Sequence, residues 1–285
     1  DHFIERIGVD QLLEVFVPHN DFRIKLAPAK ALGVVVRNLV LHREPIYSLN
    51  EWAKPFDAKL LGIDAGDVDL LNDDRVGRSL ARLFDSDRAS LLNRLVLDVV
   101  DRFSIDTNQL HNDSTSVRFA GSYRNANGSI RAGKTTPAIL HGHSKDHRPD
   151  LKQLVWILTI SSDGAVPIAC RVANGNVTDD TTHIATWDSL VSLLGRSDFL
   201  YVADSKLATK TNMDHIVKGN GRFISVLPAT RKEDSALRRY VVDHELTWVE
   251  AIRHTARRKD QPEDLWWTTE APWPSAEGYR IIWVK

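Results

Sequence analysis

Two aspartates have the residue type and the setting that divalent-metal chemistry needs. Asp204 ends the apolar run 199–204, and Asp113 lies in the stretch 110–119, which is dense in Ser, Thr, Val and Phe. Both stretches have the composition and length of β-strands. Parallel strands bring functional residues together at their carboxyl ends. We therefore expect the two carboxylates to lie close together if their strands are neighbours.

A carboxylate pair of this kind favours a hard cation. Neighbouring strands lie about 4.8 Å apart, so the two charges repel, and one group takes up a proton unless a cation lies between them. Oxygen ligands, completed by water and substrate phosphate, favour Mg²⁺ or Mn²⁺ over zinc. Two such ions can activate a water or a 3′-hydroxyl against a phosphodiester. Such a site generally needs a third acid, and the alternative for each aspartate is a cap or turn.

The elements around the two aspartates define an expected fold. The predicted strands are 110–119, 154–160, 166–172, 199–204 and 223–227, and the predicted helices between them are 184–194 and 207–217. The middle strands form a hairpin around Gly164, and Gly195 ends the first helix. This order of strand, hairpin, helix, strand, helix and strand is that of a ribonuclease H-like mixed sheet. In such a sheet the strands that carry Asp113 and Asp204 are neighbours.

The flanking segments differ from this α/β centre. Residues 1–104 have the apolar periodicity of helices and could form a DNA-binding module or a packing or dimerisation domain; residues 1–56 hold seven basic and seven acidic residues. After residue 228 the pattern is β-rich and aromatic, with four of the eight tryptophans in 266–283. We predict a helical domain at 1–104, a ribonuclease H-like catalytic core at 105–229 and an incomplete β-rich insertion segment at 230–285.

Composition excludes several classes of protein. No run approaches the roughly 18 apolar residues of a membrane span, we recognise no secretory leader, and the single cysteine, Cys170, fits a reducing cytosol. The net charge of −1 hides two basic stretches. Residues 118–152 hold seven Lys or Arg against two acids, and residues 206–239 hold eight against three. Both are suited to a phosphate backbone.

Four blocks of sequence carry a family resemblance. Residues 142–153, 110–116, 167–182 and 201–205 resemble the DDE transposases of bacterial insertion sequences, in the branch whose ribonuclease H-like core contains a β-rich insertion. The resemblance implies cut-and-paste DNA transposition, in which Mg²⁺-dependent (or Mn²⁺-dependent) strand cleavage precedes strand transfer. It also implies double-stranded DNA partners, namely transposon ends and target, a homodimer on that DNA, and a bacterial cytoplasmic, nucleoid-associated location.

The resemblance assigns catalytic and metal-binding roles position by position. Asp113 matches the first catalytic acid and Asp204 the second. The third, a glutamate in a Tyr-x2-Arg-x3-Glu-x6-Lys pattern, has no match, and Glu277 is rejected because Tyr279 and Arg280 are adjacent. We therefore expect a chain that is truncated before the third acid. The alternatives are an inactive transposase that binds transposon-end DNA or the intact enzyme as an inhibitor and, more distantly, a host nuclease.

Further residues are candidates for DNA contact. The basic candidates for phosphate contact are Lys145, Arg148, Lys152, Lys206 and Lys210, and the aromatic candidates for base stacking are Trp266, Trp267 and Trp273. The alternatives are a solvated loop or helix surface for the basic residues and a small aromatic core for the tryptophans. The spacing of His141, His143 and His147 suggests zinc, but no cysteine supports it, so we expect phosphate contacts or loop hydrogen bonds there.

Overall fold

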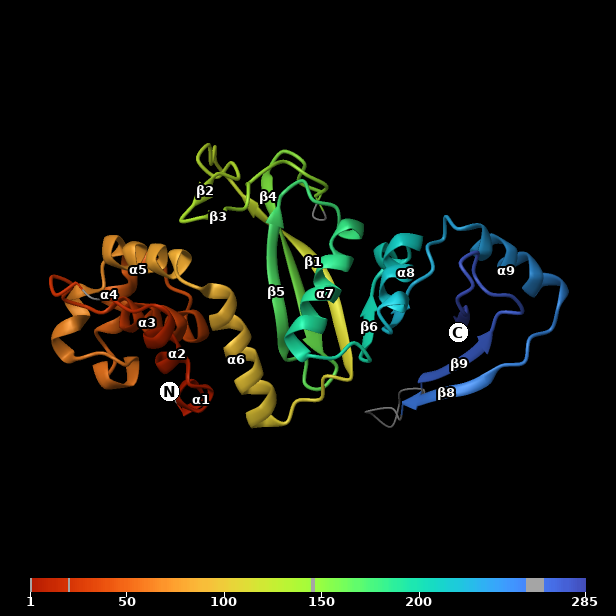
Figure 1. Cartoon of the computed structure of the whole chain (residues 1–285), viewed down its shortest axis with the longest axis horizontal. Coiled ribbons are helices and arrows are strands. Elements are labelled where there is room, and N and C mark those ends of the chain that lie inside the picture. The colour runs from red at the N-terminus through yellow and green to blue at the C-terminus, as the bar shows by residue number, and fades with distance from the viewer. Residues whose placement is uncertain (1, 20, 145–146, 255–263) are drawn as a thin grey trace. The chain divides into compact units, whose positions relative to one another are not determined.

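The computed structural model of the 285-residue chain describes residues 2–19, 21–144, 147–254 and 264–285 (Figure 1). The chain forms two compact units, one of residues 1–107 and 114–176 and the other of 108–113 and 177–285. A five-stranded sheet has the order β5-β4-β1-β6-β7. Every helix among the described residues is too short or too polar to cross a lipid bilayer.

The first unit begins with the helices that the sequence predicts. They are α1 (His2–Ile7), α2 (Val9–Phe16), α3 (Pro28–Leu41), α4 (Leu49–Ala53), α5 (Asp73–Asp85) and α6 (Arg88–Phe103), with 3-10 turns η1 (Ile46–Ser48), η2 (Ala58–Leu61) and η3 (Ala65–Leu70). Helix α5 starts where the Asn72 side chain accepts from Arg75 N. Asp87 caps α6 by accepting from Ser90 N. Both caps satisfy backbone N–H groups that have no partner inside the helix.

One buried ion pair joins the helices of this part. The side chain of Arg37 in α3 is 5% exposed, and its Nη2 lies 2.7 Å from Oδ2 of Asp10 in α2. Its Nε donates to the carbonyl of Leu60 in η2 at 2.9 Å. The guanidinium therefore connects three elements, and Asp10 is the carboxylate that pairs with it in this buried setting.

We predict that Asp10→Ala destabilises the helical part by about 2 kcal/mol, because the buried Arg37 guanidinium loses two hydrogen bonds to a charged acceptor. Hydrogen exchange of the α3 amides and the denaturant midpoint measure this loss. Asp69→Ala, which removes an exposed carboxylate, is the matched control. Equal stability of the two variants would show that Arg37 does not need its partner.

The first unit also contains the predicted hairpin. Strands β4 (Lys152–Ser161) and β5 (Pro167–Asn174) pair antiparallel, with Leu154 opposite Asn174 and a bulge after Thr159. Alternate residues of β4 are buried from Gln153 to Ser161, which is the period-2 pattern of a strand with two unlike faces. A short hairpin of β2 (Ile130–Arg131) and β3 (Lys134–Thr135) precedes it.

The second unit supplies the parallel strands. Its elements are the first part of β1 (Gln109–Phe119), η4 (Asp179–Thr181), α7 (His183–Leu194), β6 (Leu200–Ala203), η5 (Ser205–Leu207), α8 (Lys210–Lys218) and β7 (Arg222–Ser225). Strand β6 pairs parallel with β1 and with β7. An added Cβ on Gly219 would lie 2.3 Å from the Trp187 ring, so the end of α8 packs directly on α7. The strand order confirms the predicted ribonuclease H-like mixed α/β fold.

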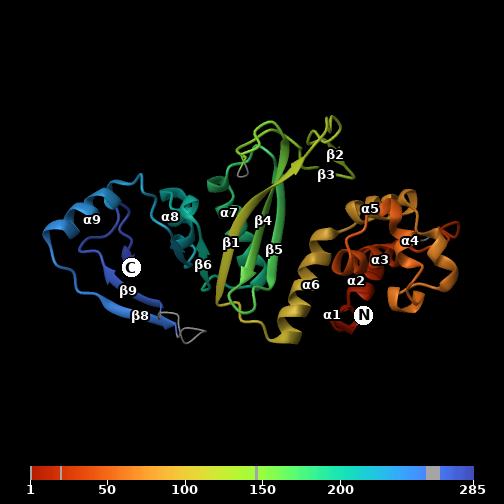
Figure 2. The same cartoon turned by 180° about the vertical axis from the view of Figure 1, so that it is seen from behind.

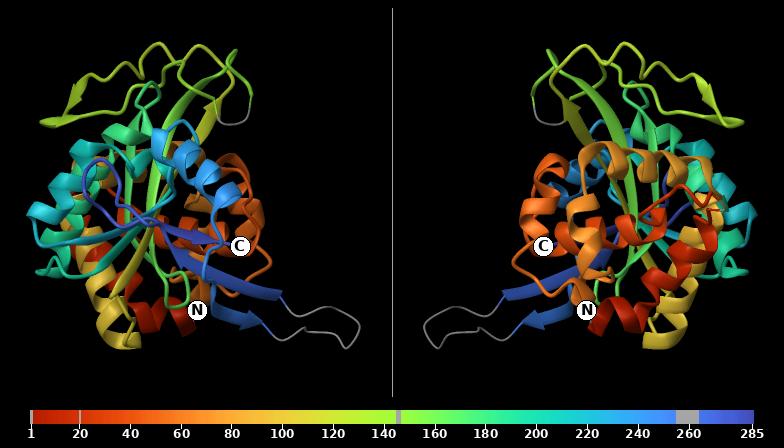
Figure 3. Two further views of the ribbon diagram at one scale, coloured as in Figure 1. Left: turned by 90° about the vertical axis from the view of Figure 1, so that its right-hand side faces the viewer. Right: turned by 90° about the vertical axis from the view of Figure 1, so that its left-hand side faces the viewer.

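The last part of the second unit is a small sheet with a helix. Helix α9 (Lys232–Asp243) precedes β8 (Val249–His254), β9 (Asp264–Glu270) and β10 (Ile282–Val284), which pair antiparallel in the order β10-β9-β8. Figures 2 and 3 show β8 and β9 lying side by side. The C-terminal β-sheet confirms the predicted β-rich segment, but α9 was not predicted. Its sequence is mostly charged and buries only Leu237, which leaves little apolar periodicity to detect.

Candidate active site at the ends of β1 and β6

The pairing register brings Asp113 and Asp204 to one end of two adjacent parallel strands. The pairs run from Gln109 with Leu200 to Asn112 with Ala203, so the two aspartates are the next residues along their strands. Asn112 is buried and Asp113 is exposed, because side chains alternate along a strand. Asp204 is exposed as well. Two carboxylates therefore share one sheet edge, with their main chains about 4.8 Å apart.

Backbone contacts hold Asp204 in place. Its Oδ1 accepts from Lys206 N at 3.0 Å, which caps the 3-10 turn η5. Its carbonyl oxygen accepts from Ser225 Oγ in β7 at 2.7 Å. Its Oδ2 accepts no hydrogen bond from the described residues. Asp204 therefore serves as a cap with one oxygen and leaves the second for a ligand, so the structural and the functional interpretation are compatible.

The magnitude of the repulsion favours a cation at this edge. At about 5 Å, two unit charges interact by about 1 to 3 kcal/mol for effective dielectric constants between 80 and 20. Both carboxylates are exposed, so water screens the repulsion toward the lower value. A repulsion of this size does not prevent folding. A divalent cation between the two carboxylates would attract both of them.

A loop of the same unit adds two more acids near this edge. Asp179 and Asp180 lie in η4, which packs against η5. The Asn212 side chain of α8 donates to the carbonyl of Asp180 at 2.8 Å. These acids lie between the predicted hairpin and the next helix in the sequence, and the folded chain brings them near the strand ends.

His183, the first residue of α7, is a further residue that sequence reasoning missed. Its side chain is 3% exposed, and Nδ1 lies 3.2 Å from the Tyr201 hydroxyl. Its Nε2 is buried without a partner among the described residues. Burial lowers the pKa of His183, while Asp204 and more weakly the acids of η4 and Asp113 act in the opposite direction. Desolvation is the largest effect, so the imidazole is neutral at pH 7.

This burial predicts a stability that depends on pH. The unfolded His183 takes up a proton below its ordinary pKa of 6.5, whereas the folded side chain resists it. Stability is therefore full above pH 6.5 and falls below it, by at most about 1.4 kcal/mol per pH unit. Hydrogen exchange of α7 and β6 between pH 7.5 and 5.5 should show this slope, and His183→Gln should reduce it. The exposed His141→Gln is the control, and an unchanged slope in His183→Gln would contradict the account.

The donor set fits a hard divalent ion only in part. Asp113 and Asp204 offer the carboxylate oxygens that Mg²⁺ and Mn²⁺ prefer, with room for water. Among the described residues no group of three or more His, Cys, Asp or Glu side chains is arranged to hold a metal. Glu277 takes part in another network, in which its Oε2 accepts from Arg231 Nη2 at 2.7 Å and Ser275 Oγ at 3.0 Å. The Arg231 guanidinium lowers the pKa of Glu277.

The predicted basic contacts have individual environments. Arg148 makes a bidentate ion pair with Asp150, with distances of 2.8 and 2.7 Å. Lys152 Nζ donates to the carbonyl of Ser122 at 2.6 Å. Lys145 lies outside the described residues.

The two lysines after Asp204 differ from each other. The side chain of Lys206 is exposed, whereas Lys210 Nζ lies 2.9 Å from Asp214 Oδ2, one helical turn further along α8. The i,i+4 spacing of Lys210 and Asp214 was a sequence signal for this pair. A phosphate contact by Lys210 or Arg148 therefore has to compete with a neighbouring carboxylate.

The three candidate tryptophans also differ. Trp266 in β9 is 48% exposed and lies opposite Ile252 of β8, which is exposed too. Trp267 is half-buried. Trp273 packs edge-on against Tyr240 of α9, with ring centroids 5.1 Å apart. Trp266 therefore presents the most accessible ring for stacking, and Trp273 contributes to a small aromatic core.

Comparisons with known proteins found one family model and several solved structures that are similar to the chain. Residues 1–97 match a family model described as a domain of unknown function, DUF4277. No curated protein matches the chain. The piggyBac transposase in a synaptic complex with hairpin DNA is similar over 100% of this chain and 58% of its own, at 10% identity and a TM-score of 0.45.

The Mos1 transposase in a paired-end complex with the left transposon end is similar over 76% of this chain and 62% of its own, at 12% identity and a TM-score of 0.27. A Mos1 mariner paired-end complex with Mn is similar over 79% and 67%, at 10% identity and a TM-score of 0.28. The chain thus spans less than two thirds of the first two proteins. The solved structures assign no residue of this chain, so Asp113 and Asp204 rest on the sequence motifs and on the strand register.

Proposed function

We propose that this chain is part of a metal-dependent DNA transposase that cleaves and joins DNA strands at Asp113 and Asp204. The observation that carries the proposal is the register of β1 and β6, which places both carboxylates at one edge of a ribonuclease H-like sheet. If Asp113 and Asp204 served only as caps at the ends of their strands, they would not need to lie next to each other. The sequence blocks that resemble bacterial insertion-sequence transposases support the same residues.

The two aspartates would hold Mg²⁺ or Mn²⁺ through their exposed oxygens. A bound ion would polarise a phosphodiester oxygen and lower the pKa of a coordinated water. The chain contributes orientation, because Lys206 N and Ser225 Oγ fix both the carboxylate and the main chain of Asp204. The exposed Lys206 side chain, two residues after Asp204, would contact phosphate near the scissile bond. The third acid of the family pattern remains unmatched within residues 1–285.

Double-stranded DNA is the proposed partner, both as transposon ends and as target, with a homodimer forming on paired ends. Arg148 and Lys152 would contact the sugar-phosphate backbone, which carries affinity without reading sequence. Trp266 would stack on an extruded base, for which its exposed ring is suited. These DNA contacts add to the proposed catalysis at Asp113 and Asp204, which does not depend on them.

The proposal predicts that Asp113→Asn and Asp204→Asn each abolish Mn²⁺-dependent nicking of supercoiled plasmid, with a loss of at least about 100-fold, while DNA affinity changes less than about 2-fold. The reason is that each substitution removes an anionic ligand without removing a positive charge. Asp188→Asn, an exposed carboxylate in α7, is the matched control. Full nicking in either site variant would remove that residue from the site.

A second candidate is a chain that binds transposon-end DNA, or the intact enzyme, without cutting. It is favoured by the lack of a three-ligand metal group among the described residues. The same assay separates the two functions. Wild-type chain that binds end DNA tightly but never nicks it in Mg²⁺ or Mn²⁺ would support the inhibitor and exclude catalysis by residues 1–285 alone.

A further inference from the structure

Three adjoining hollows line one side of the N-terminal helical part. The largest has a volume of about 710 Å³, and Arg82 lines all three, so they form one continuous depression. Its walls are the loop 21–28 and helix α5. We call it the arginine groove and define it by its basic side chains, Arg23, Lys25, Arg75, Arg78 and Arg82. The groove lies wholly within the first unit.

Helical periodicity explains why three of these cations face one way. Arg75, Arg78 and Arg82 follow at i, i+3 and i+7 of α5, which places them along one stripe. The buried residues Val76 and Ser79 hold the adjoining stripe against the helical core. At 1.5 Å per residue the three guanidinium groups extend over about 10 Å. This length corresponds to about three nucleotide steps of one DNA strand, at 3.4 Å each.

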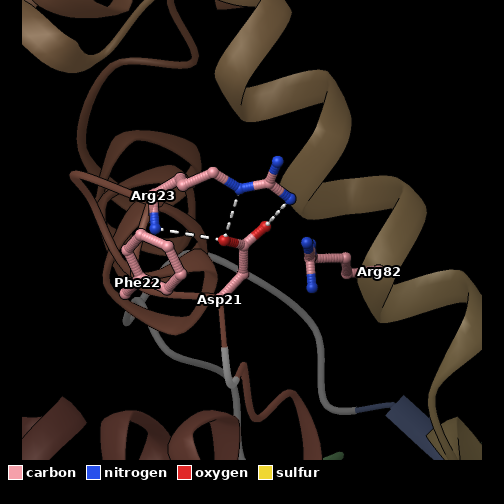
Figure 4. Close-up of a pocket in the computed structure, with 4 residues that line it drawn as sticks. All are labelled: Asp21, Phe22, Arg23 and Arg82. Atoms are coloured by element: carbon pink, nitrogen blue, oxygen red, sulfur yellow. Dashed lines mark hydrogen bonds and ion pairs between the residues drawn. The ribbon is translucent and has the colours of Figure 1, made fainter.

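The charge in the groove is only partly neutralised. Asp21 and Asp85 are its two carboxylates, and each is paired, Asp21 with Arg23 at 2.9 Å and Asp85 with Arg131 at 2.8 Å. The side chains of Arg78 and Arg82 make no hydrogen bond or ion pair within the described part of the chain. Figure 4 shows Arg82 directed toward the Asp21–Arg23 pair. Exposed guanidinium groups that converge without partners favour an anion with several phosphates.

An exposed aromatic ring lies at the mouth of the groove. Phe22 is 96% exposed, lies between Asp21 and Arg23 in the chain, and lines the same hollow as Arg82 (Figure 4). Leaving a phenylalanine in water forgoes about 1.5 to 3 kcal/mol of burial. A single exposed ring is ordinary on a protein surface, but a ring in the same hollow as the exposed Arg82 side chain supplies the two components of nucleic-acid binding, which are phosphate contact and base stacking.

We propose that the arginine groove binds DNA, with the α5 arginines on successive phosphates of one strand and Phe22 stacked on a neighbouring unpaired base. The inference rests on the proposed function only for DNA as the ligand, since it uses neither Asp113 nor Asp204. A lipid surface would need a broad apolar face, and a phosphopeptide would fill fewer of the cationic positions. The length of the arginine stripe and the adjacent ring therefore favour a nucleic acid.

Fluorescence anisotropy tests the groove with two labelled probes, a blunt 20-base-pair duplex and the same duplex with a six-nucleotide overhang. Arg78→Gln/Arg82→Gln is compared with Arg43→Gln/Lys59→Gln, which removes two exposed charges elsewhere in the helical part. Between 50 and 200 mM salt the groove variant should lose about 1.8 from the slope of log affinity against log salt, at about 0.9 per phosphate contact. Its affinity should fall at least about 10-fold, while the control stays within 2-fold of wild type.

Phe22→Ala separates stacking from charge. It should weaken binding of the overhang probe by at least about 5-fold, as expected for loss of one stacked base, and leave the blunt duplex unchanged. Arg78, Arg82 and Phe22 are exposed, so thermal unfolding should match wild type in every variant and exclude misfolding as the cause.

The outcomes distinguish this inference from the proposed catalysis. If the groove variant binds both probes as tightly as the control variant does, the groove does not bind DNA, even if Asp113→Asn abolishes nicking. If the wild-type chain never nicks DNA but the groove variant has a lower DNA affinity and a smaller salt slope, DNA binding by the groove is supported and the catalytic proposal fails. A doubly phosphorylated peptide that binds more tightly than either probe would identify a protein-docking site and overturn the inference.

Discussion

The in-register parallel pairing of β1 with β6 is the constraint on which the candidate site depends. It forces Asp113 and Asp204 to the same sheet edge, where their charges repel by about 1 to 3 kcal/mol. The surrounding contacts keep Asp204 at this edge despite the repulsion. Lys206 N and Ser225 Oγ fix Asp204, and the Asn212 side chain joins the acidic turn η4 to helix α8. An edge that keeps negative charge together is suited to receive a cation.

The buried polar groups of the second unit support the same edge from the interior. His183 is uncharged because burial outweighs the acids near it, so it adds no positive charge that would compete with a metal ion. Its bond to the Tyr201 hydroxyl links α7 to β6, three residues before Asp204. Arg231 ties Glu233 and Glu277 together, with contacts of 2.6 and 2.7 Å, and so joins the start of α9 to the turn before β10.

The sequence predicted the elements whose signal is local. The apolar run before Asp204, the hairpin of β4 and β5 and the glycine that ends α7 follow from strand composition and capping, and the strand order then predicted the neighbour of Asp204. The sequence did not predict the charged helix α9, because this helix buries one leucine and has almost no apolar stripe. The sequence did not predict a role for His183, because the residues next to it in the sequence give no sign that its side chain is buried. The sequence did not predict the arginine groove, because Arg23 lies far from Arg78 and Arg82 along the chain and meets them only in the folded structure.

The central claim is that Asp113 and Asp204 bind one cation site together. Iron-directed cleavage tests it most directly, because Fe²⁺ bound in a Mg²⁺ site generates hydroxyl radicals that cut the nearby main chain. With Fe²⁺, ascorbate and peroxide, the account predicts cuts beside residues 113 and 204, suppressed by excess Mg²⁺, with both sets lost in Asp204→Asn. Cuts at residue 113 that persist in Asp204→Asn, or cuts confined to other parts of the chain, would contradict a shared site.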